Sequence, residues 1–292
     1  MGRLNGKTAV ITGASRGFGF AIAQAYASEG ASLLIASRSE NAINNAVNIL
    51  RESGANASGY PTDVSDLNQV DALAAHAQKI YGHFDIWINN AALAAPYGPT
   101  VDIDPDTFSY VIQTNIHGVY NGSITAMRHF ISRNQGKLIN ILGRGDRQPV
   151  PMQNAYASSK TWIHNFTLAL AKENINSNIG IYLYNPGLME TDLLENIEVI
   201  TGYEDRLKPM TTIMRMWSRS PIIPAQRAVW LASSATDGRS GLVIKELGFS
   251  HIAGGALKEG FHRLTRKHQP EKKLIITSIP SSNRTTPQAD QT

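Results

Sequence analysis

The stretch Thr8-Ala-Val-Ile-Thr-Gly-Ala-Ser-Arg-Gly-Phe-Gly19 decides the fold of this chain. An apolar run ends at Thr12, and a turn with Gly13, Gly17 and Gly19 leads directly into a helical pattern. Glycine lets the backbone approach a ligand closely, and the free amides of a helix N-terminus attract a pyrophosphate. A glycine trio alone is weak evidence because any tight turn uses glycine. The strand before it and the helix after it favour a dinucleotide-binding turn.

Outward from this turn, short β-rich runs alternate with longer helical patterns, which is typical of parallel strands joined by crossover helices. We expect strands at residues 8–12, 32–36, 57–61, 85–89, 137–142, 179–184 and 242–245. We expect helices at residues 18–29, 41–52, 67–81, 105–132, 154–174 and 225–234. Asp104 before Pro105 is a favourable helix start. The sequence therefore predicts an α/β fold with one doubly wound, parallel, seven-stranded sheet.

One domain, residues 1–255, accounts for this alternation. Residues 190–224 interrupt it, and we interpret them as a lid over a ligand. A basic C-terminal extension, residues 256–278, follows the domain. Residues 279–292 are mostly Ser, Thr, Pro, Asn and Gln, and we expect a flexible, disordered tail because they bury too little apolar surface.

The lid is rich in apolar side chains, which permit two interpretations. They either line the site of a bulky, mostly apolar molecule or pack against the body of the protein. The side chains concerned are Met189, Leu193, Leu194, Ile197, Met210, Met214, Met216 and Trp217.

Composition excludes several classes of function. The chain of 292 residues is 42% hydrophobic and 17% charged with a formal net charge of +4, which favours a packed core over a disordered or nucleic-acid-coating protein. The cations between Lys258 and Lys273 are interpreted as a solvated segment; an entry path for an acidic substrate is the alternative. Cysteine is absent, and no signal peptide or long apolar run is evident. We expect a cytoplasmic protein without metal, membrane or nucleic-acid partners.

The end of the second predicted strand indicates which dinucleotide binds. An acid about twenty residues past the glycines would bind the ribose hydroxyls of NAD. In this chain the position of that acid is occupied by Ser37, which is followed by Arg38, and Arg16 lies in the glycine turn. Guanidinium groups suit a 2′-phosphate because they are always charged and donate in pairs. The sequence therefore predicts NADP(H).

Tyr156 and Lys160 lie one helical turn apart and indicate redox chemistry. Hydride transfer to a carbonyl carbon leaves negative charge on the oxygen, which needs a proton donor. A free phenol has a pKa of about 10, and an ammonium on the same helix face would lower that pKa. Tyr156 would then donate a proton to the carbonyl oxygen during reduction.

With these motifs in this order, roughly residues 5–250 resemble the short-chain dehydrogenase/reductase family. The resemblance implies a Rossmann-type fold and a catalytic set of Tyr156, Lys160 and Asn115, with Asn115 distorting its helix and holding a water beside Lys160. It also implies a cofactor held by several segments. These comprise Gly13, Ser15, Arg16, Gly17, Phe18, Gly19, Arg38, Asp63, Val64, Asn90, Ala91, Pro186, Gly187, Leu188 and Thr191, together with Tyr156 and Lys160.

Gly143, thirteen residues before Tyr156, departs from the family pattern. The family carries a Ser there that orients the substrate carbonyl, and loss of one such donor can cost about a hundredfold to a thousandfold in rate. Three explanations are open. The hydroxyl is replaced by the Gly143 backbone amide, by the loop of residues 144–147 or by a group of the substrate; or the enzyme reduces a bond other than a plain ketone; or catalysis is lost. If only the donor is missing, Gly143→Ser should raise activity toward simple ketones.

The sequence thus predicts an NADPH-dependent oxidoreductase that reduces the carbonyl of a bulky, apolar small molecule. One alternative is an NADP(H)-binding sensor or interaction protein without turnover. Another is an enzyme that acts on C=C or C=N bonds or catalyses a non-redox step. By resemblance, helices 105–132 and 154–174 pair between subunits of a homodimer or homotetramer.

Overall fold

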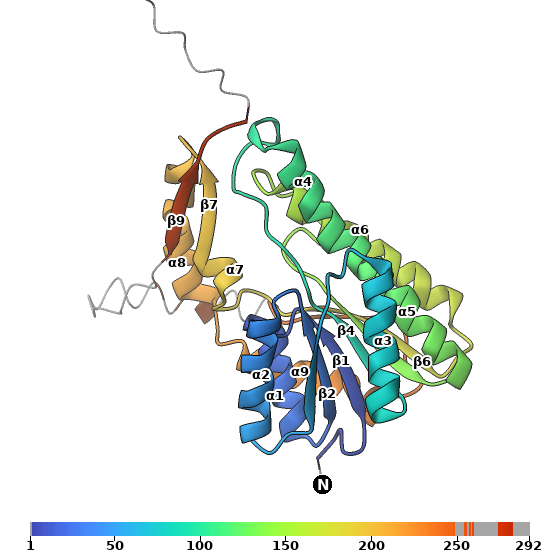
Figure 1. Cartoon of the computed structure of the whole chain (residues 1–292). Coiled ribbons are helices and arrows are strands. Elements are labelled where there is room, and N and C mark those ends of the chain that lie inside the picture. The colour runs from blue at the N-terminus through green and yellow to red at the C-terminus, as the bar shows by residue number, and fades with distance from the viewer. Residues whose placement is uncertain (1, 249–253, 256, 258, 260–273, 283–292) are drawn as a thin grey trace, which may run out of the picture.

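A computed structural model describes residues 2–248, 254, 255, 257, 259 and 274–282. Its main sheet has seven parallel strands in the order β3-β2-β1-β4-β5-β6-β8 (Figure 1). The strands are β1 (Thr8–Thr12), β2 (Ser32–Ser37), β3 (Ala57–Pro61), β4 (Ile86–Asn89), β5 (Gly136–Ile141), β6 (Ile179–Asn185) and β8 (Leu242–Lys245). All seven predicted strands are confirmed to within one residue at each end. The chain reverses its direction of winding between β1 and β4, the position where open α/β sheets bind ligands.

Helices cover both faces of this sheet. In chain order they are α1 (Gly17–Ser28), α2 (Glu40–Glu52), α3 (Leu67–Tyr81), α4 (Pro105–Ile112), α5 (Gly118–Arg133), α6 (Asn154–Glu173), α7 (Asp192–Glu195), α8 (Lys208–Trp217) and α9 (Ile222–Ala232). Ile11 of β1 packs in a core with α1, α2 and α9, whereas Val10 packs in a second core with α3, α5 and α6. Strands buried on both faces are the reason that the sequence shows continuous apolar runs rather than alternation.

The predicted helix 105–132 is interrupted, which corrects the sequence interpretation. Asp104 caps α4 as expected, since its carboxylate accepts a hydrogen bond from the Thr107 amide at 2.8 Å. A π-helical turn, Gln113–His117, then separates α4 from α5. Such turns widen a helix locally and frequently occur at functional sites.

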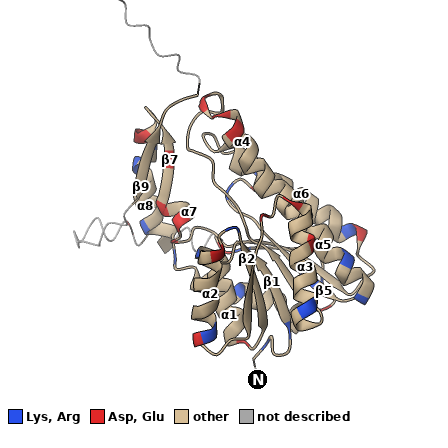
Figure 2. Ribbon diagram, viewed as in Figure 1, with Lys and Arg blue, Asp and Glu red and all other residues tan. Residues whose placement is uncertain are grey.

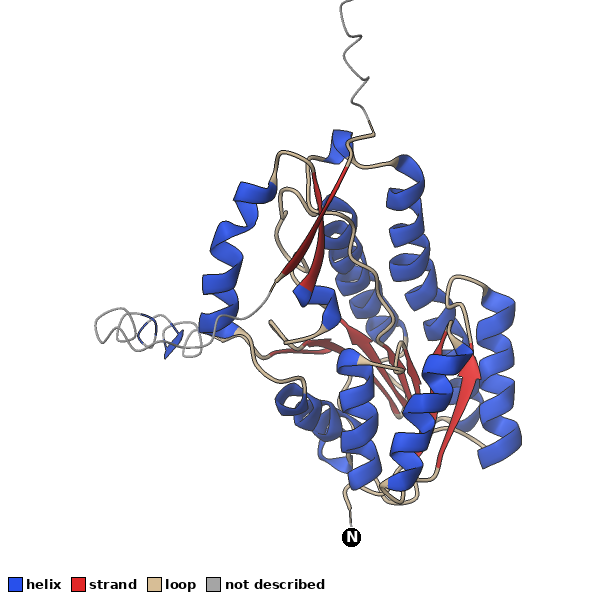
Figure 3. Ribbon diagram, turned by 60° about the vertical axis from the view of Figure 1, so that its left-hand side comes forward, coloured by secondary structure: helices blue, strands red, loops and turns tan. Residues whose placement is uncertain are grey.

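Residues 191–217 leave the body and form, with residues 274–282, a substructure that we call the roof. It contains α7, β7 (Asn196–Ile200), a 3-10 turn (Glu204–Leu207) and α8. Strand β7 pairs in parallel with β9 (Ile275–Ile279), and Figure 3 shows this ribbon apart from the main sheet. Where the chain leaves and rejoins the body, Arg219 pairs with Leu188 and Glu190 through backbone hydrogen bonds of 3.2 and 3.1 Å.

The roof corrects two further predictions. The sequence does not predict β7 or β9, and Ile279 belongs to β9 rather than to a disordered tail. Ser281 and Ser282 are also held, because both donate hydrogen bonds to Asp102. The predicted tail therefore applies at most to residues 283–292, which lie outside the described residues, as do most of residues 256–273.

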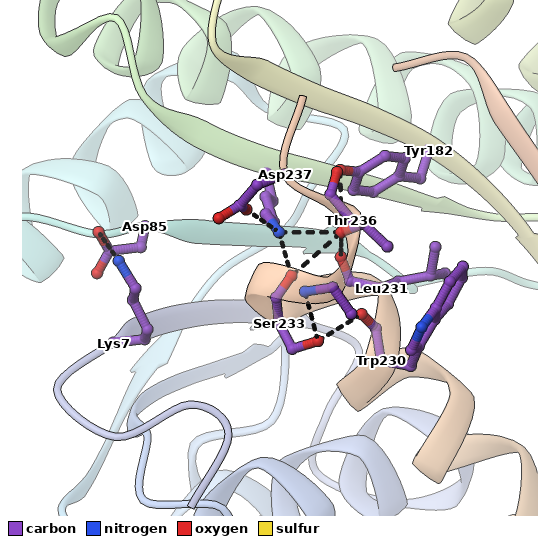
Figure 4. A network of polar contacts seen from close by, with 10 residues as sticks. Lys7, Asp85, Tyr182, Trp230, Leu231, Ser233, Thr236 and Asp237 are labelled. Carbon is purple, nitrogen blue, oxygen red and sulfur yellow. Dashed lines mark hydrogen bonds and ion pairs between the residues drawn. The ribbon is translucent and has the colours of Figure 1, made fainter. Parts of the chain in front are cut away.

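The amino-terminal edge of the sheet carries a network of ion pairs. Lys137 of β5 contacts the Asp237 carboxylate at 2.7 Å and donates to the Thr236 hydroxyl at 2.9 Å. Figure 4 shows Asp237 and Thr236 in this network and Lys7 beside Asp85. Burial lowers the pKa of Lys137. These contacts tie the connection between α9 and β8 to β5, which leaves the opposite, carboxyl-terminal edge for a ligand.

Acidic residues are prominent near that carboxyl-terminal edge. Figure 2 shows them on α4 and α7, where Asp106, Asp192 and Glu195 occupy the first helical turns. Among the described residues, no helix is long and apolar enough to span a membrane. Within those same residues, no group of three or more His, Asp or Glu side chains is arranged to hold a metal ion.

Candidate active site

The glycine turn packs against the segment that follows β4. Gly13 and Gly17 have positive φ angles of 63° and 59°, a conformation that glycine adopts without strain. A Cβ on Gly13 would lie 2.6 Å from the Ala91 Cα, and the Asn90 side chain donates to the Gly13 carbonyl at 2.9 Å. Two predicted cofactor segments, 13–19 and 90–91, therefore meet where β1 and β4 lie side by side.

This edge has the features that a dinucleotide requires. Helix α1 starts at Gly17, and no side chain in the described part of the chain caps it. The Ser37 hydroxyl, at the end of β2, is buried without a hydrogen-bond partner among these residues. An unsatisfied buried hydroxyl is costly, and a ribose or phosphate oxygen would satisfy it. The residues present thus fit a dinucleotide.

The two predicted phosphate-binding arginines lie in different surroundings. The Arg38 guanidinium is 5.4 Å from the centroid of the Tyr110 ring, and within the described residues no acid forms an ion pair with it. Arg16 instead pairs with Asp192, the first residue of α7, at 3.0 Å. Both members of that pair are largely exposed. No sequence pattern indicates that Asp192, which is 176 residues from Arg16, pairs with it.

Asp63 and Val64 have structural roles in the turn after β3. The Asp63 carboxylate accepts hydrogen bonds from the Ser65 amide at 2.9 Å and from the Ser65 hydroxyl at 2.7 Å. Val64 is buried, and Asn121 of α5 donates to its carbonyl at 3.0 Å. That Asp63 and Val64 contact adenine stays a prediction.

Tyr156 and Lys160 lie on one face of α6, next to the end of β5. The Lys160 Nζ is 5.4 Å from the Tyr156 ring centroid and donates to the Ile141 carbonyl at 3.1 Å. Burial lowers the pKa of Lys160 to about 8 and raises the pKa of Tyr156 to about 12. The pKa of Tyr156 is thus shifted opposite to the expected lowering, because burial disfavours the charged phenolate.

Asn115 lies in the π-helical turn, so the predicted distortion of its helix is confirmed. It is fully buried, and its side chain forms two hydrogen bonds with the backbone of Leu93, at 2.8 and 2.9 Å. It also donates to the Ser159 hydroxyl at 3.2 Å. Asn115 thus joins the segment after β4 to the residue preceding Lys160, and the sequence offered no signal for the contact with Leu93.

Gly143 is buried beside the phenol of Tyr156. A Cβ built on Gly143 would lie 2.2 Å from the Tyr156 hydroxyl. The phenol therefore occupies the volume that a Ser side chain would need. Gly143→Ser therefore has to shift the Tyr156 hydroxyl as well as add a donor, and its effect on activity stays a prediction.

Neighbouring polar contacts hold the Gly143 loop. Asn185 at the end of β6 donates to the Gly143 carbonyl at 3.2 Å and accepts from the Gly187 amide at 3.1 Å. Buried Asp146 pairs with Lys245 of β8 at 2.7 Å. Sequence reasoning missed Asn185 and Asp146, because only the order of strands in the sheet brings them to this loop.

The segment from Pro186 to Thr191 leads into the roof above the glycine turn. Gly187 has a φ of 78°. A Cβ on Gly17 would be 3.8 Å from the Thr191 methyl group. The structure therefore brings the predicted residues after β6 to the turn after β1.

Much of the apolar side-chain surface of the roof is used internally. Met214 is fully buried, and Met210 and Leu207 are 8% and 2% exposed. Leu193 is 45% exposed. For Met210 and Met214, packing within the protein is therefore the correct one of the two interpretations.

A groove of about 800 Å³ runs along the outer face of α6. Ala157, Thr161, Trp162 and Phe166 line it, and Tyr156 does not. The groove is separate from the Tyr156 site and lies on a helix that the resemblance expects at a subunit interface.

Comparisons with known proteins agree with this architecture. The model of the short chain dehydrogenase family matches residues 7–199. A 3beta-hydroxysteroid dehydrogenase 1 of Eggerthella lenta is 33% identical over 232 residues, which cover 79% of this chain and 88% of the relative. Oxidoreductase UcpA of Salmonella typhimurium is 31% identical over 246 residues, covering 82% and 93% respectively.

Solved structures show the same fold. A gluconate 5-dehydrogenase of Burkholderia cenocepacia, in complex with NADP and tartrate, is 27% identical with a TM-score of 0.73, covering 83% of this chain and 94% of that chain. A 3-ketoacyl-(acyl-carrier-protein) reductase of Brucella melitensis, complexed with NADH, is 27% identical with a TM-score of 0.75, covering 85% and 100%. The chain therefore belongs to the short-chain dehydrogenase/reductase family.

Proposed function

We propose that this protein is an NADPH-dependent oxidoreductase that transfers a hydride to the carbonyl of a small molecule. The observation that carries the proposal is the arrangement of Tyr156 and Lys160 at the carboxyl-terminal edge of the sheet. Family membership supports the reaction class. The named relatives include a hydroxysteroid dehydrogenase and a ketoacyl reductase.

The unsatisfied Ser37 hydroxyl and the Arg38 side chain support NADP(H) as the cofactor. An acid at the end of β2 would repel a 2′-phosphate, whereas Arg38 offers it two donors and a positive charge. Gly13, Gly17 and Gly19 would admit the pyrophosphate, and the Pro186–Thr191 segment would face the nicotinamide. The named solved structures hold NADP in one case and NADH in the other, so they support a nicotinamide cofactor without choosing between the two.

Burial keeps Tyr156 in the protonated form, which is the form that carbonyl reduction requires. When bound, the cofactor supplies the hydride. A phenol with a pKa of about 12 stays protonated at neutral pH and holds the proton that the carbonyl oxygen needs. Lys160 would orient the ribose of the cofactor, and Asn115 would hold a water that returns the proton to Tyr156.

A bulky, apolar substrate remains the proposed class, although the structure reduces its support. Met210 and Met214 face the interior. The exposed Leu193 and five half-buried side chains are left as candidates for substrate contact, namely Met189, Leu194, Ile197, Met216 and Trp217. The groove on α6 and the exposed Tyr120 on α5 support a homodimer or homotetramer. A cytoplasmic location stays a prediction from the sequence.

NADPH deuterated at the transferable C4 position tests the proposal. The labelled cofactor is incubated with a panel of ketones and aldehydes, and the products are examined by mass spectrometry and NMR. We expect deuterium on the new carbinol carbon and preference for NADPH over NADH. Deuterium on a former alkene carbon, or faster turnover with NADH, would contradict the proposal.

Gly143 favours one second candidate, an NADP(H)-binding protein without turnover. This candidate predicts tight NADPH binding and no oxidation of NADPH with any carbonyl in the panel. Fluorescence titration of NADPH beside the product assay therefore separates the two functions.

A further inference from the structure

We infer that the C-terminal strand β9 is a positioning element for the active site, acting on Tyr156 through Met152. The inference rests on the proposed function of Tyr156. A continuous series of backbone hydrogen bonds connects these elements, which lie far apart in the sequence. The roof therefore helps to position the start of α6, which carries Tyr156.

The first connection runs from β9 through β7 to the segment after β4. β9 pairs with β7 over five residues, and the Thr201 amide donates to the Ile279 carbonyl at 2.9 Å. On the other side of β7, the Tyr97 amide donates to the Glu198 carbonyl at 2.8 Å and its carbonyl accepts from Ile200 at 3.0 Å. β7 is therefore held between β9 and Tyr97, and Figure 1 shows β7 beside β9.

The second connection runs from Tyr97 to the entry of α6. The Gly98 amide donates to the Met152 carbonyl at 2.9 Å. A Cβ on Gly98 would lie 2.5 Å from Ile200 of β7, so this close packing requires glycine. The Thr100 hydroxyl also accepts a hydrogen bond from Asn154, the first residue of α6, at 3.2 Å.

Met152 is where this path reaches the catalytic helix. It has a φ of 69°, in the left-handed region that a residue with a Cβ adopts at a cost. Such strain persists only where surrounding contacts maintain it, and it concentrates at functional sites. Met152 precedes Tyr156 by four residues, and the α6 hydrogen bonds begin immediately after it, with Ala157 donating to Gln153 at 2.9 Å.

Asp102 anchors the end of the path. Its carboxylate accepts from the Ser281 hydroxyl at 2.8 Å, and its carbonyl accepts from the Ser282 amide at 3.1 Å. The Tyr203 hydroxyl contacts the same carboxylate at 3.4 Å. The C-terminal segment and the lid are thereby fastened to the segment that holds Met152.

A pair of proline variants in β9 tests the inference. In a parallel ladder the amide and carbonyl of one residue point to the same side, so Thr277 faces β7 as Ile279 does, and Ile276 faces away. Thr277→Pro removes a ladder donor, whereas Ile276→Pro places the same ring at an outward-facing position. We expect Thr277→Pro to lower turnover by about tenfold to a hundredfold with unchanged NADPH affinity, and Ile276→Pro to retain turnover.

Hydrogen exchange gives a readout that does not depend on turnover. We expect faster exchange in Thr277→Pro for the Gly98 amide and the first amides of α6, with unchanged protection in β1. Equal turnover of the two proline variants, or unchanged exchange at Gly98, would overturn the inference. If the wild-type protein oxidises no NADPH with any carbonyl, the proposed function fails, and the exchange result still decides whether β9 holds the entry of α6.

Relief of the strain at Met152 provides a rescue experiment. Met152→Gly removes the cost of the positive φ, whereas Met152→Ala keeps that cost and removes most of the side chain. Combined with Thr277→Pro, we expect Met152→Gly to recover part of the lost turnover and Met152→Ala to recover none. Equal recovery in both combinations would show that Met152 is not the residue through which β9 acts.

Discussion

The body and the roof are built on different physical principles. Every residue of β1 is buried, and each neighbouring strand in the main sheet is parallel to the next. In the roof, four of the five residues of β9 are exposed, and Ile275 is 59% exposed. Burial of apolar surface stabilises the body and also the part of the roof that contains Met214, whereas the exposed strand β9 is held mainly by backbone pairing and a few polar contacts. We therefore expect the largest effects from variants of body residues at the site and smaller effects from variants of exposed roof residues.

Tyr156→Phe, in the body, should have the largest effect, since it removes the hydroxyl that we propose as the proton donor. We expect the rate of carbonyl reduction to fall by about a hundredfold to ten-thousandfold, because general acid catalysis contributes on this scale. NADPH affinity should be unchanged. Single-turnover absorbance of NADPH measures the first quantity and fluorescence titration the second. Full activity in this variant would show that another group donates the proton.

Substitutions of Gly143 test whether space or a missing donor limits the site. Because a Cβ would lie 2.2 Å from the Tyr156 hydroxyl, we expect both Gly143→Ala and Gly143→Ser to lower kcat. A displaced phenol should cost about tenfold to a hundredfold. The Ala variant adds the Cβ without a hydroxyl and is the matched control. A Ser variant faster than wild type would restore the donor hypothesis.

Arg38→Ala should change cofactor choice without changing the chemistry. Loss of hydrogen bonds to a charged phosphate costs about 1.5–3 kcal/mol, which corresponds to about tenfold to a hundredfold weaker NADPH binding. NADH binding should stay the same, because NADH lacks the phosphate. Titration calorimetry with both cofactors measures the difference. Equal weakening for NADPH and NADH would mean that Arg38 contacts a part that the two cofactors share.

The pH dependence of reduction should report the pKa of Lys160. Burial lowers this pKa to about 8, so the ammonium is lost as the pH rises through 8. We expect kcat/KM to fall above that pH by about tenfold per unit, if the charged form is required. Below the pH of this transition the rate should be flat, because Tyr156 with a pKa of about 12 stays protonated. A profile that is flat to pH 10 would show that the charge of Lys160 is not needed.

The same pKa shift predicts an effect on stability. The unfolded chain binds the Lys160 proton up to about pH 10.5, and the folded protein releases it above about pH 8. The unfolded state therefore binds more protons between these values, so this residue makes the free energy of unfolding rise with pH there. Urea titrations of wild type and Lys160→Met across this range measure the contribution, and identical slopes would contradict it.

Asp192→Asn removes an ion pair between the body and the roof and should have the smallest effect. The pair between Arg16 and Asp192 joins the body to the roof, and both side chains are exposed. Such pairs contribute about 0–1 kcal/mol, so freeing Arg16 should tighten NADPH binding by at most about fivefold. The gain should vanish in the Arg16→Ala background and at high salt. Tighter NADH binding in Asp192→Asn would indicate a different cause.

The predictability of the site differs between its parts. Tyr156 and Lys160 share a helix face, so their spacing alone places them together. Gly13 and Asn90 follow neighbouring strands, so a correct sheet order predicts their proximity. The pKa of Tyr156 was not predictable, because its direction depends on how completely the surroundings exclude water. The sequence pattern at Gly143 shows a missing hydroxyl, but it does not show that the Tyr156 phenol lies beside this position, because the two residues belong to different segments of the chain.

The sequence by itself determined the seven-stranded body, the glycine turn and the Tyr156–Lys160 pair, because apolar periodicity and fixed helical spacing are local properties of the chain. Three contacts follow only from the folded arrangement: β9 pairs with β7, Asp192 forms an ion pair with Arg16, and the Gly98 amide donates to Met152, which has a positive φ. These contacts join residues that are distant in sequence, through backbone groups that every residue carries. No pattern of side chains encodes such a partner, so only the folded arrangement of the chain selects it.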